Sequence, residues 1–281
     1  MSTDSKVPSV ILNNGVEMPQ LGFGVWQVPD DEAAKAVATA LEAGYRSIDT
    51  AAIYENERGT GEAVAASGIP REELFVTTKL WNSEQGYDST LRAFDASLER
   101  LGLDHVDLYL IHWPVPAKDA YVDTYRALEK IHAEGRARAI GVSNFLPEHL
   151  ERLTAETGVV PAVNQIELHP QLAQAESRAL HARLGIATEA WSPLGQGRGL
   201  LDVPALVAVA RKHGRTPAQA VLRWHLQLGN VVIPKSVTPS RIQENIDVFD
   251  FELDAEDMAA IAALDEGGRL GPNPAEFNVG A

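Results

Sequence analysis

The chain contains no cysteine among its 281 residues. It can therefore form no disulfide framework, zinc–thiolate site or cysteine-ligated iron–sulfur cluster, and it has no cysteine nucleophile. Basic residues are also scarce: 24 Lys and Arg face 39 Asp and Glu, which gives a formal net charge of −15. Because this charge repels nucleic acid and anionic membranes, we expect neither as a partner.

Long apolar runs are missing as well. No stretch approaches the ~18 apolar residues that a membrane span needs, and residues 1–6 lack the pattern of a secretory signal peptide. We therefore expect a cytoplasmic protein. A content of 45% hydrophobic and 22% charged residues is typical of globular proteins. The length fits either two average domains or one α/β barrel.

Short apolar runs alternate with longer segments of helical periodicity along the chain. An Asn-Asn-Gly turn at 13–15 between short apolar runs predicts an N-terminal β-hairpin. Apolar and β-branched runs then predict strands over residues 21–24, 47–49, 74–79, 106–112, 139–143, 162–167, 186–191 and 231–234. The predicted helices include residues 123–133, 147–157, 176–184, 204–213, 217–228, 241–248 and 254–264.

This alternation of strands and helices predicts a parallel sheet with right-handed crossovers. Eight such units are the number that closes a (β/α)8 barrel, the TIM barrel. We therefore predict a single α/β barrel domain over residues 1–281, with the hairpin and two extra helices. The alternative is an open doubly wound sheet, which usually carries G-x-G-x-x-G after its first strand. Gly22-Phe23-Gly24 lacks the third glycine, so the barrel is preferred.

Polar residues stand where the second, third and fourth predicted strands end. Asp49, Lys79 and His112 take these places, and Tyr54 lies five residues past Asp49. Each has an ordinary structural explanation: a turn or helix cap, a surface lysine, a satisfied histidine and a packing tyrosine. The C-terminal ends of barrel strands meet at the active site, however, so the four together indicate a catalytic centre.

These four side chains suit carbonyl reduction. Hydride addition to a carbonyl leaves a negative oxygen that needs a proton, and Tyr54 can supply one. The ordinary tyrosine pKa of about 10 is too high for an efficient acid at neutral pH, and we expect Lys79, held charged by Asp49, to lower it. His112 would donate a hydrogen bond to the carbonyl oxygen. No side chain carries hydride, so a nicotinamide cofactor is implied.

Separated motifs follow one another in a distinctive order. They read GYRSIDTA at 44–51, KLW at 79–81, IHWP at 111–114, GVSNF at 141–145, NQIE at 164–167, and IPKS at 233–236 with RIQEN at 241–245. In these motifs, and from about residue 12 to 264, the chain resembles the aldo-keto reductase superfamily, most closely its bacterial 2,5-diketo-D-gluconate reductase-like branch. The resemblance implies a monomeric enzyme in which Tyr54 is the proton donor, Lys79 and Asp49 tune it, and His112 orients the carbonyl.

The resemblance also implies an NADP(H) site. The residues that would hold the nicotinamide carboxamide are Ser143, Asn144 and Gln165. Those that would stack on the nicotinamide ring or line the pyrophosphate are Trp191, Ser192, Leu194 and Gly195. Those at the adenosine-phosphate end are Ile233, Lys235, Ser236, Val237, Thr238, Arg241, Glu244 and Asn245, the last two facing the adenine.

Lys235 and Arg241 also predict an anion site on physical grounds. A phosphate site near a helix N-terminus after the last two strands is common in barrels, and these cations stand six residues apart in an acidic chain. We expect them to bind the 2′-phosphate of NADP(H); the alternative is an ordinary solvated pair. Thr238 stands where several members of the family have a basic residue, which leaves open how strictly NADPH is preferred.

Tryptophans gather at the predicted barrel mouth. Trp26, Trp81 and Trp113, together with His112, predict an apolar substrate pocket directed at an oxyanion. The loop from about residue 267 is expected on the substrate side, and aldehydes, α-dicarbonyls and keto sugars all remain candidate substrates.

The sequence also bears on two other functions. A metal-dependent hydrolase is disfavoured, and no metal site is expected, because the eight histidines include no H-x-H or H-E-x-x-H pair. A non-catalytic barrel that binds NADP or a partner remains the alternative, although all four candidate catalytic residues are present.

Overall fold

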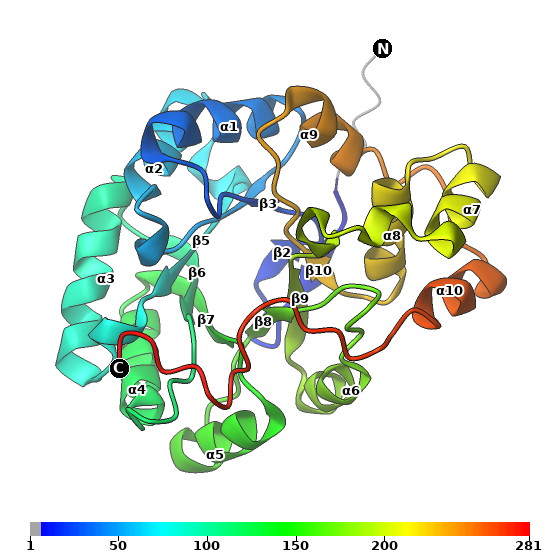
Figure 1. The fold of residues 1–281 in the computed structure, drawn as a ribbon. Coiled ribbons are helices and arrows are strands. Elements are labelled where there is room, and N and C mark those ends of the chain that lie inside the picture. Colours follow the sequence, from blue (N-terminus) through cyan, green and yellow to red (C-terminus); the bar gives the residue numbers. More distant parts are fainter. Residues whose placement is uncertain (1–6) are drawn as a thin grey trace.

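Parallel strands and helices alternate along the chain, as predicted (Figure 1). The structure is a computed structural model that describes residues 7–281. Residues 1–6, on which the prediction of no signal peptide rests, lie outside this range. The main sheet runs in the order β10 to β3, with every neighbouring pair parallel. Its strands are β3 (Phe23–Gly24), β4 (Ser47–Asp49), β5 (Phe75–Leu80), β6 (Val106–Ile111), β7 (Ala137–Ser143), β8 (Val163–Glu167), β9 (Ala187–Trp191) and β10 (Val231–Val232).

The two edges of this sheet meet and close it. Leu21, just ahead of β3, forms a parallel bridge with Val232 in β10. The backbone N–H of Gly22 donates to the Val232 carbonyl at 2.8 Å, and that of Gly24 to the Pro234 carbonyl at 3.2 Å. The sheet is therefore the predicted eight-stranded barrel. β10 stops short of the predicted end at residue 234, where proline has no backbone N–H to donate.

The predicted hairpin covers the N-terminal end of the barrel. β1 (Ser9–Ile11) and β2 (Glu17–Pro19) pair antiparallel. Leu12 and Met18 from this hairpin are buried in a cluster with apolar residues from the first halves of the strands, among them Phe75, Leu108 and Val231. Apolar packing thus closes this end of the barrel, and Asp49, Lys79 and His112 stand at the opposite, C-terminal end of the strands.

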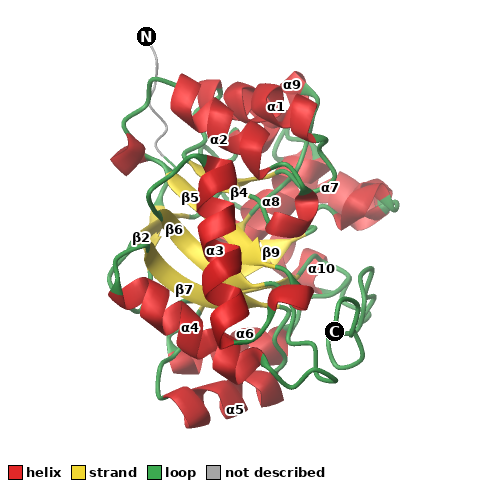
Figure 2. Ribbon diagram, turned by 90° about the vertical axis from the view of Figure 1, so that its left-hand side faces the viewer, coloured by secondary structure: helices red, strands yellow, loops and turns green. Residues whose placement is uncertain are grey.

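Helices surround the barrel on its outside (Figure 2). They are α1 (Asp30–Glu42), α2 (Glu57–Ala66), α3 (Tyr87–Leu101), α4 (Tyr121–Ala133), α5 (Pro147–Thr157), α6 (Ala175–Leu184), α7 (Pro204–Lys212), α8 (Pro217–Gln227), α9 (Pro239–Ile246) and α10 (Ala255–Ala262). β9 and β10 are each followed by two helices, which accounts for the two extra ones. α9 begins two residues before the predicted start at 241, because Pro239 suits the first helical turn. No helix within residues 7–281 has both the length and the apolar character needed to cross a bilayer.

Candidate active site

An ion pair sealed from water lies at the centre of the barrel mouth. Lys79 Nζ on β5 donates to Asp49 Oδ1 at the end of β4 at 2.5 Å, and to the Thr50 carbonyl at 2.9 Å. The two paired side chains are 0% and 3% exposed. Burial lowers the pKa of Lys79, but Asp49 and Tyr54 outweigh burial and leave that pKa above its usual value. Lys79 is therefore a fixed ammonium held by Asp49.

Tyr54 lies beside this ammonium, in the short 3-10 helix η1 (Ala52–Tyr54). Lys79 Nζ is 5.1 Å from the centre of the Tyr54 ring. Burial raises the pKa of Tyr54, and Lys79, which lowers it, offsets burial only in part. Lys79 thus lowers the pKa of Tyr54 as expected, but burial outweighs it, so the net pKa lies above the ordinary value and not below it. Tyr54 keeps its proton through neutral pH.

His112 completes the group, here called the tetrad (Asp49, Tyr54, Lys79 and His112). Its ring packs edge-on against Tyr54, with centroids 5.6 Å apart, and against Trp81 at 5.4 Å. Burial, reinforced by Lys79, lowers the pKa of His112 well below its usual value, so the ring is neutral. His112 Nδ1 is sealed without a partner among residues 7–281, whereas Nε2 is not among the sealed unpaired atoms. Nε2 is therefore the ring nitrogen open to a ligand.

The ends of β7, β8 and β9 form one hydrogen-bonded network. Ser143 Oγ donates to the Gln165 carbonyl at 2.8 Å. Asn144 Nδ2 donates to the His112 carbonyl at 3.0 Å, and Asn144 Oδ1 accepts from Trp191 Nε1 at 2.8 Å. Asn144 has φ 62°, a left-handed conformation that asparagine tolerates better than most residues. The residues expected at the nicotinamide are thus brought together, and they position one another.

Cations at the other end of the candidate cofactor site are exposed. Lys235 and Arg241 are both exposed, and neither forms an ion pair within residues 7–281. Between them, the Thr238 backbone N–H donates to Ser236 Oγ at 3.1 Å just before α9 begins. Glu244, expected at the adenine, accepts a hydrogen bond from Thr216 Oγ1 at 2.7 Å. Two free cations at a helix N-terminus suit a phosphate group.

The donors and acceptors fit a dinucleotide phosphate. Gln165 Oε1 accepts no hydrogen bond within the described chain and is not one of its sealed atoms. Trp191 is half-buried, while Lys235 and Arg241 are unpaired. An amide acceptor, an aromatic surface and two cations are the groups that a carboxamide, a nicotinamide ring and a phosphate would meet. The stretch expected at the pyrophosphate follows β9, where Ser192 Oγ accepts from Gln196 Nε2 at 2.8 Å.

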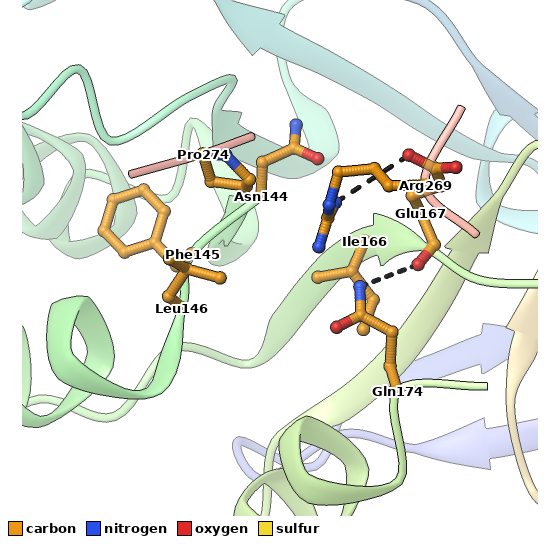
Figure 3. A pocket seen from close by; sticks show the side chains of 8 residues that line it. All are labelled: Asn144, Phe145, Leu146, Ile166, Glu167, Gln174, Arg269 and Pro274. Atoms are coloured by element: carbon orange, nitrogen blue, oxygen red, sulfur yellow. Dashed lines mark hydrogen bonds and ion pairs between the residues drawn. The ribbon is translucent and has the colours of Figure 1, made fainter. Parts of the chain in front are cut away.

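The C-terminal tail (residues 267–281) is held against this network. Glu167, fully buried at the end of β8, accepts from the backbone N–H groups of Leu270 at 2.6 Å and Gly271 at 2.9 Å. Figure 3 shows Arg269 turned toward the same carboxylate, at 3.7 Å. A Cβ at Gly271 would lie 2.6 Å from the Trp191 ring, so the tail passes too close for any larger residue. The start of the tail therefore packs on Trp191.

The rest of the tail crosses the barrel mouth to the side of α3 and α4 (Figure 1). Phe277 packs on Trp113, with ring centroids 4.4 Å apart. Asn82 Nδ2 donates to the Val279 carbonyl at 2.8 Å, which fixes the far end. Of the other expected substrate residues, Trp81 packs on His112, and Trp26 is 43% exposed.

Sequence reasoning missed three residues here. Glu189 is buried two positions before Trp191 on β9, and the two-residue period of a strand would have placed both on one face. Glu167 lies within the NQIE motif, where only the path of the tail reveals its partners. Phe277 stands in an irregular segment without any periodic signal.

Comparison with known proteins gives consistent matches. The family model described as "Aldo/keto reductase family" matches residues 20–266. An aldo-keto reductase of Mycolicibacterium smegmatis is 62% identical over 271 residues, covering 96% of this chain and 98% of the relative. A glyoxal reductase of Bacillus subtilis is 56% identical over 270 residues, covering 96% and 97%. The crystal structure of a Gox0644 variant in complex with NADPH superposes with a TM-score of 0.93 at 51% identity, covering 97% and 99%.

Proposed function

The chain belongs to the aldo/keto reductase family, and from this premise we propose how its residues divide the work of reduction. The protein is an oxidoreductase that reduces carbonyl groups with NADP(H). The observation that supports the division best is the sealed Lys79–Asp49 pair beside Tyr54 and a neutral His112. A non-catalytic barrel would not need the ion pair to stand beside a protonated tyrosine and a histidine nitrogen that is open to a ligand.

The cofactor would be held at both ends of the site. Gln165, with Ser143 and Asn144, meets the carboxamide, and Trp191 lies against the nicotinamide ring. The residues that we propose along the pyrophosphate and the adenosine phosphate are Ser192, Leu194, Gly195, Ile233, Lys235, Ser236, Val237, Thr238, Arg241, Glu244 and Asn245. NADPH, when bound, supplies the hydride to the carbonyl carbon.

The tetrad handles the oxygen of the substrate. His112, neutral and open at Nε2, donates a hydrogen bond that orients the carbonyl oxygen. As that oxygen becomes negative, Tyr54 gives it a proton. The tyrosinate left behind is stabilised by the Lys79 ammonium, which Asp49 holds charged. The raised pKa of Tyr54 ensures that the proton is present before the substrate arrives.

We propose small α-dicarbonyls as the preferred substrates, with other aldehydes and keto sugars also accepted. The proposal is supported by the glyoxal reductase of Bacillus subtilis at 56% identity and by the aromatic mouth formed by Trp26, Trp81 and Trp113. The tail, with Phe277 packed on Trp113, would be the substrate-side wall of a single-domain barrel. We further propose that the protein is a monomer in the cytoplasm and that it binds neither nucleic acid nor membranes.

Loss of the reduced-nicotinamide absorbance with methylglyoxal tests this function. Wild-type protein should oxidise NADPH faster than NADH, because only NADPH offers a 2′-phosphate to Lys235 and Arg241. The Tyr54→Phe variant should lose roughly 10²–10⁴-fold in turnover, which is the usual contribution of a general acid, while its affinity for NADPH stays unchanged. Activity within a few-fold of wild type would show that Tyr54 is not the acid.

A further inference from the structure

A second buried carboxylate lies beside the tetrad. Glu189 on β9 is 1% exposed, and the groups whose charges face it are Asp49 on β4, Lys79 on β5 and Tyr54 in η1. Lys79 is already committed to Asp49 at 2.5 Å. This part of the barrel therefore holds one ammonium for two carboxyl groups, and the mechanism above uses only one of them.

The side-chain amide of Gln165 connects the two carboxyl groups. Gln165 Nε2 donates to Asp49 Oδ2 at 2.8 Å and to Glu189 Oε2 at 2.9 Å. An amide nitrogen has two hydrogens, so both are used. The opposite orientation would set the amide oxygen against the Asp49 carboxylate, which is unfavourable. Gln165 Oε1 is thus the one polar atom of this side chain left for a ligand, and it can only accept.

We propose that Glu189 is a positioning residue, which as a neutral acid fixes the Gln165 amide so that its carbonyl oxygen accepts a hydrogen bond from the carboxamide N–H of the nicotinamide. This inference rests on the proposed function, because Gln165 must face the cofactor. Glu189 lies outside the tetrad, and through it Gln165 meets the NH₂ group of the carboxamide rather than the oxygen.

The surroundings of Glu189 favour its neutral form. Glu189 Oε1 is sealed and has no partner within residues 7–281, and a buried charged oxygen without a donor is strongly unfavourable. Burial raises the pKa of Glu189, and the nearby Asp49 charge raises it further. A proton on Oε1 leaves Oε2 free to accept from Gln165, as the structure has it. If the proton left, the new charge would raise the pKa of Tyr54 and hold its proton more tightly.

Binding of NADP⁺ and of its 3-acetylpyridine analogue, which has a methyl group in place of the carboxamide NH₂, tests the positioning. Quenching of tryptophan fluorescence gives both affinities without turnover. Wild-type protein should prefer NADP⁺ by roughly three- to tenfold, the range of one hydrogen bond. Glu189→Val removes the acceptor, so the preference should fall to near unity. Glu189→Gln retains a carbonyl acceptor and mimics the neutral acid, so it should restore the preference.

The pH profile gives a second readout, which a merely structural role would not change. Wild-type turnover should decline on the alkaline side as Glu189 ionises, whereas Glu189→Gln should hold its rate to higher pH. Glu57→Gln is the matched control: Glu57 is an equally buried carboxyl that accepts from Thr78 Oγ1 and Arg100 Nε. Within residues 7–281 its carboxyl accepts no hydrogen bond from the tetrad or from Gln165, so both readouts should match wild type.

Two results would overturn the proposal: an unchanged NADP⁺ preference in Glu189→Val, or alkaline limbs that superimpose for Glu189→Gln and wild type. If the valine variant does not fold, the glutamine variant decides alone. Wild-type turnover of methylglyoxal tests the proposed function separately, so the two can fail independently.

Discussion

The tetrad and the phosphate end of the proposed cofactor site differ in how their charges are partnered. At the tetrad, Lys79 is sealed and paired with Asp49. At the phosphate end, Lys235 and Arg241 are exposed and have no carboxylate partner in the described chain. At the tetrad, the folded chain itself supplies the carboxylate that neutralises Lys79. At the phosphate end, an anionic ligand must supply the charge that neutralises Lys235 and Arg241.

Because of this difference, the charges of the tetrad should affect the stability of the fold, whereas those of the phosphate end should affect cofactor binding. A buried ion pair that loses one member leaves an uncompensated charge, which destabilises the fold strongly. An exposed cation is solvated in the free protein, so its removal changes little until an anion is bound. Substitutions in the two regions should therefore produce different combinations of effects.

The largest effect is expected when the sealed pair is broken. Lys79→Met leaves Asp49 buried without its ammonium, and we expect a loss of about 3–5 kcal/mol in the free energy of unfolding. Turnover should fall at least 100-fold, because no charge then stabilises the tyrosinate. Urea unfolding and NADPH oxidation measure the two effects.

The double variant Asp49→Leu with Lys79→Met serves as the control for this prediction. It removes both charges, so it should be more stable than the sum of the single losses predicts. Strict additivity would mean that the two residues do not interact across their 2.5 Å contact.

Removal of the rim cations should give the next largest effect, confined to binding. Lys235→Met with Arg241→Met should weaken NADPH binding by roughly 10–100-fold, since two charge-assisted contacts with a phosphate are lost. NADH affinity and the free energy of unfolding should stay close to wild type. Titration of tryptophan fluorescence at low and high salt measures both affinities, and the wild-type preference for NADPH should shrink as salt increases.

Arg183→Met is the matched control for the rim. Arg183 is also exposed and unpaired among the described residues, but it lies in the last turn of α6, a helix that follows β8. Its loss should leave the affinities for NADPH and NADH unchanged. An equal loss of both affinities in the Lys235/Arg241 variant would show that these residues do not read the 2′-phosphate.

The same contrast explains what the sequence could predict. The barrel followed from the alternation of apolar runs and helical segments. Strands that are buried on both faces appear as continuous apolar runs, and helices show their buried face through the 3.6-residue period. Asp49, Lys79 and His112 could be found because each stands at the end of such a strand. The helix over Pro147–Thr157 was predicted to the residue, since Pro147 marks its start and Gly158, with φ 76°, its end.

Features that depend on contacts between distant segments were not predictable. The path of the tail is fixed by hydrogen bonds from the backbone N–H groups of residues 270 and 271 to the Glu167 carboxylate. Because nearly every residue type has a backbone N–H, the sequence does not show which ones bind this carboxylate. The lowering of the Tyr54 pKa by Lys79 was predicted, but the larger rise caused by burial was not, because a motif does not show how deeply the ring is buried. The sharing of Gln165 between Asp49 and Glu189 likewise requires that β8 and β9 pair in register and that β4, which is not their neighbour in the sheet, approach them across the barrel.

A smaller effect is expected at the substrate-side wall, where the C-terminal tail packs on Trp113. Phe277→Ala removes the ring that packs on Trp113, and we expect KM for methylglyoxal to rise a few-fold as the tail loosens. NADPH affinity should not change, since Phe277 lies at the far end of the tail from Trp191. Initial rates at varied substrate measure KM. A matched loss of NADPH affinity would instead mean that the tail acts through Trp191.

The smallest effect is expected from acid, and it tests whether the centre is truly sealed. Burial and Lys79 hold the pKa of His112 well below its ordinary value of about 6.5, so the ring stays neutral on mild acidification. The kcat/KM for reduction should therefore stay flat through pH 6.5, where a solvated histidine would give a step. His112 takes up a proton below about pH 6.5 in the unfolded chain but stays neutral in the folded chain. The free energy of unfolding should therefore decrease as the pH falls below about 6.5. In Lys79→Met, the His112 pKa followed by NMR should move upward, because one of its two depressing causes is gone. A step in the wild-type rate near pH 6.5 would mean that His112 titrates like a solvated histidine and that burial and Lys79 do not hold its pKa down.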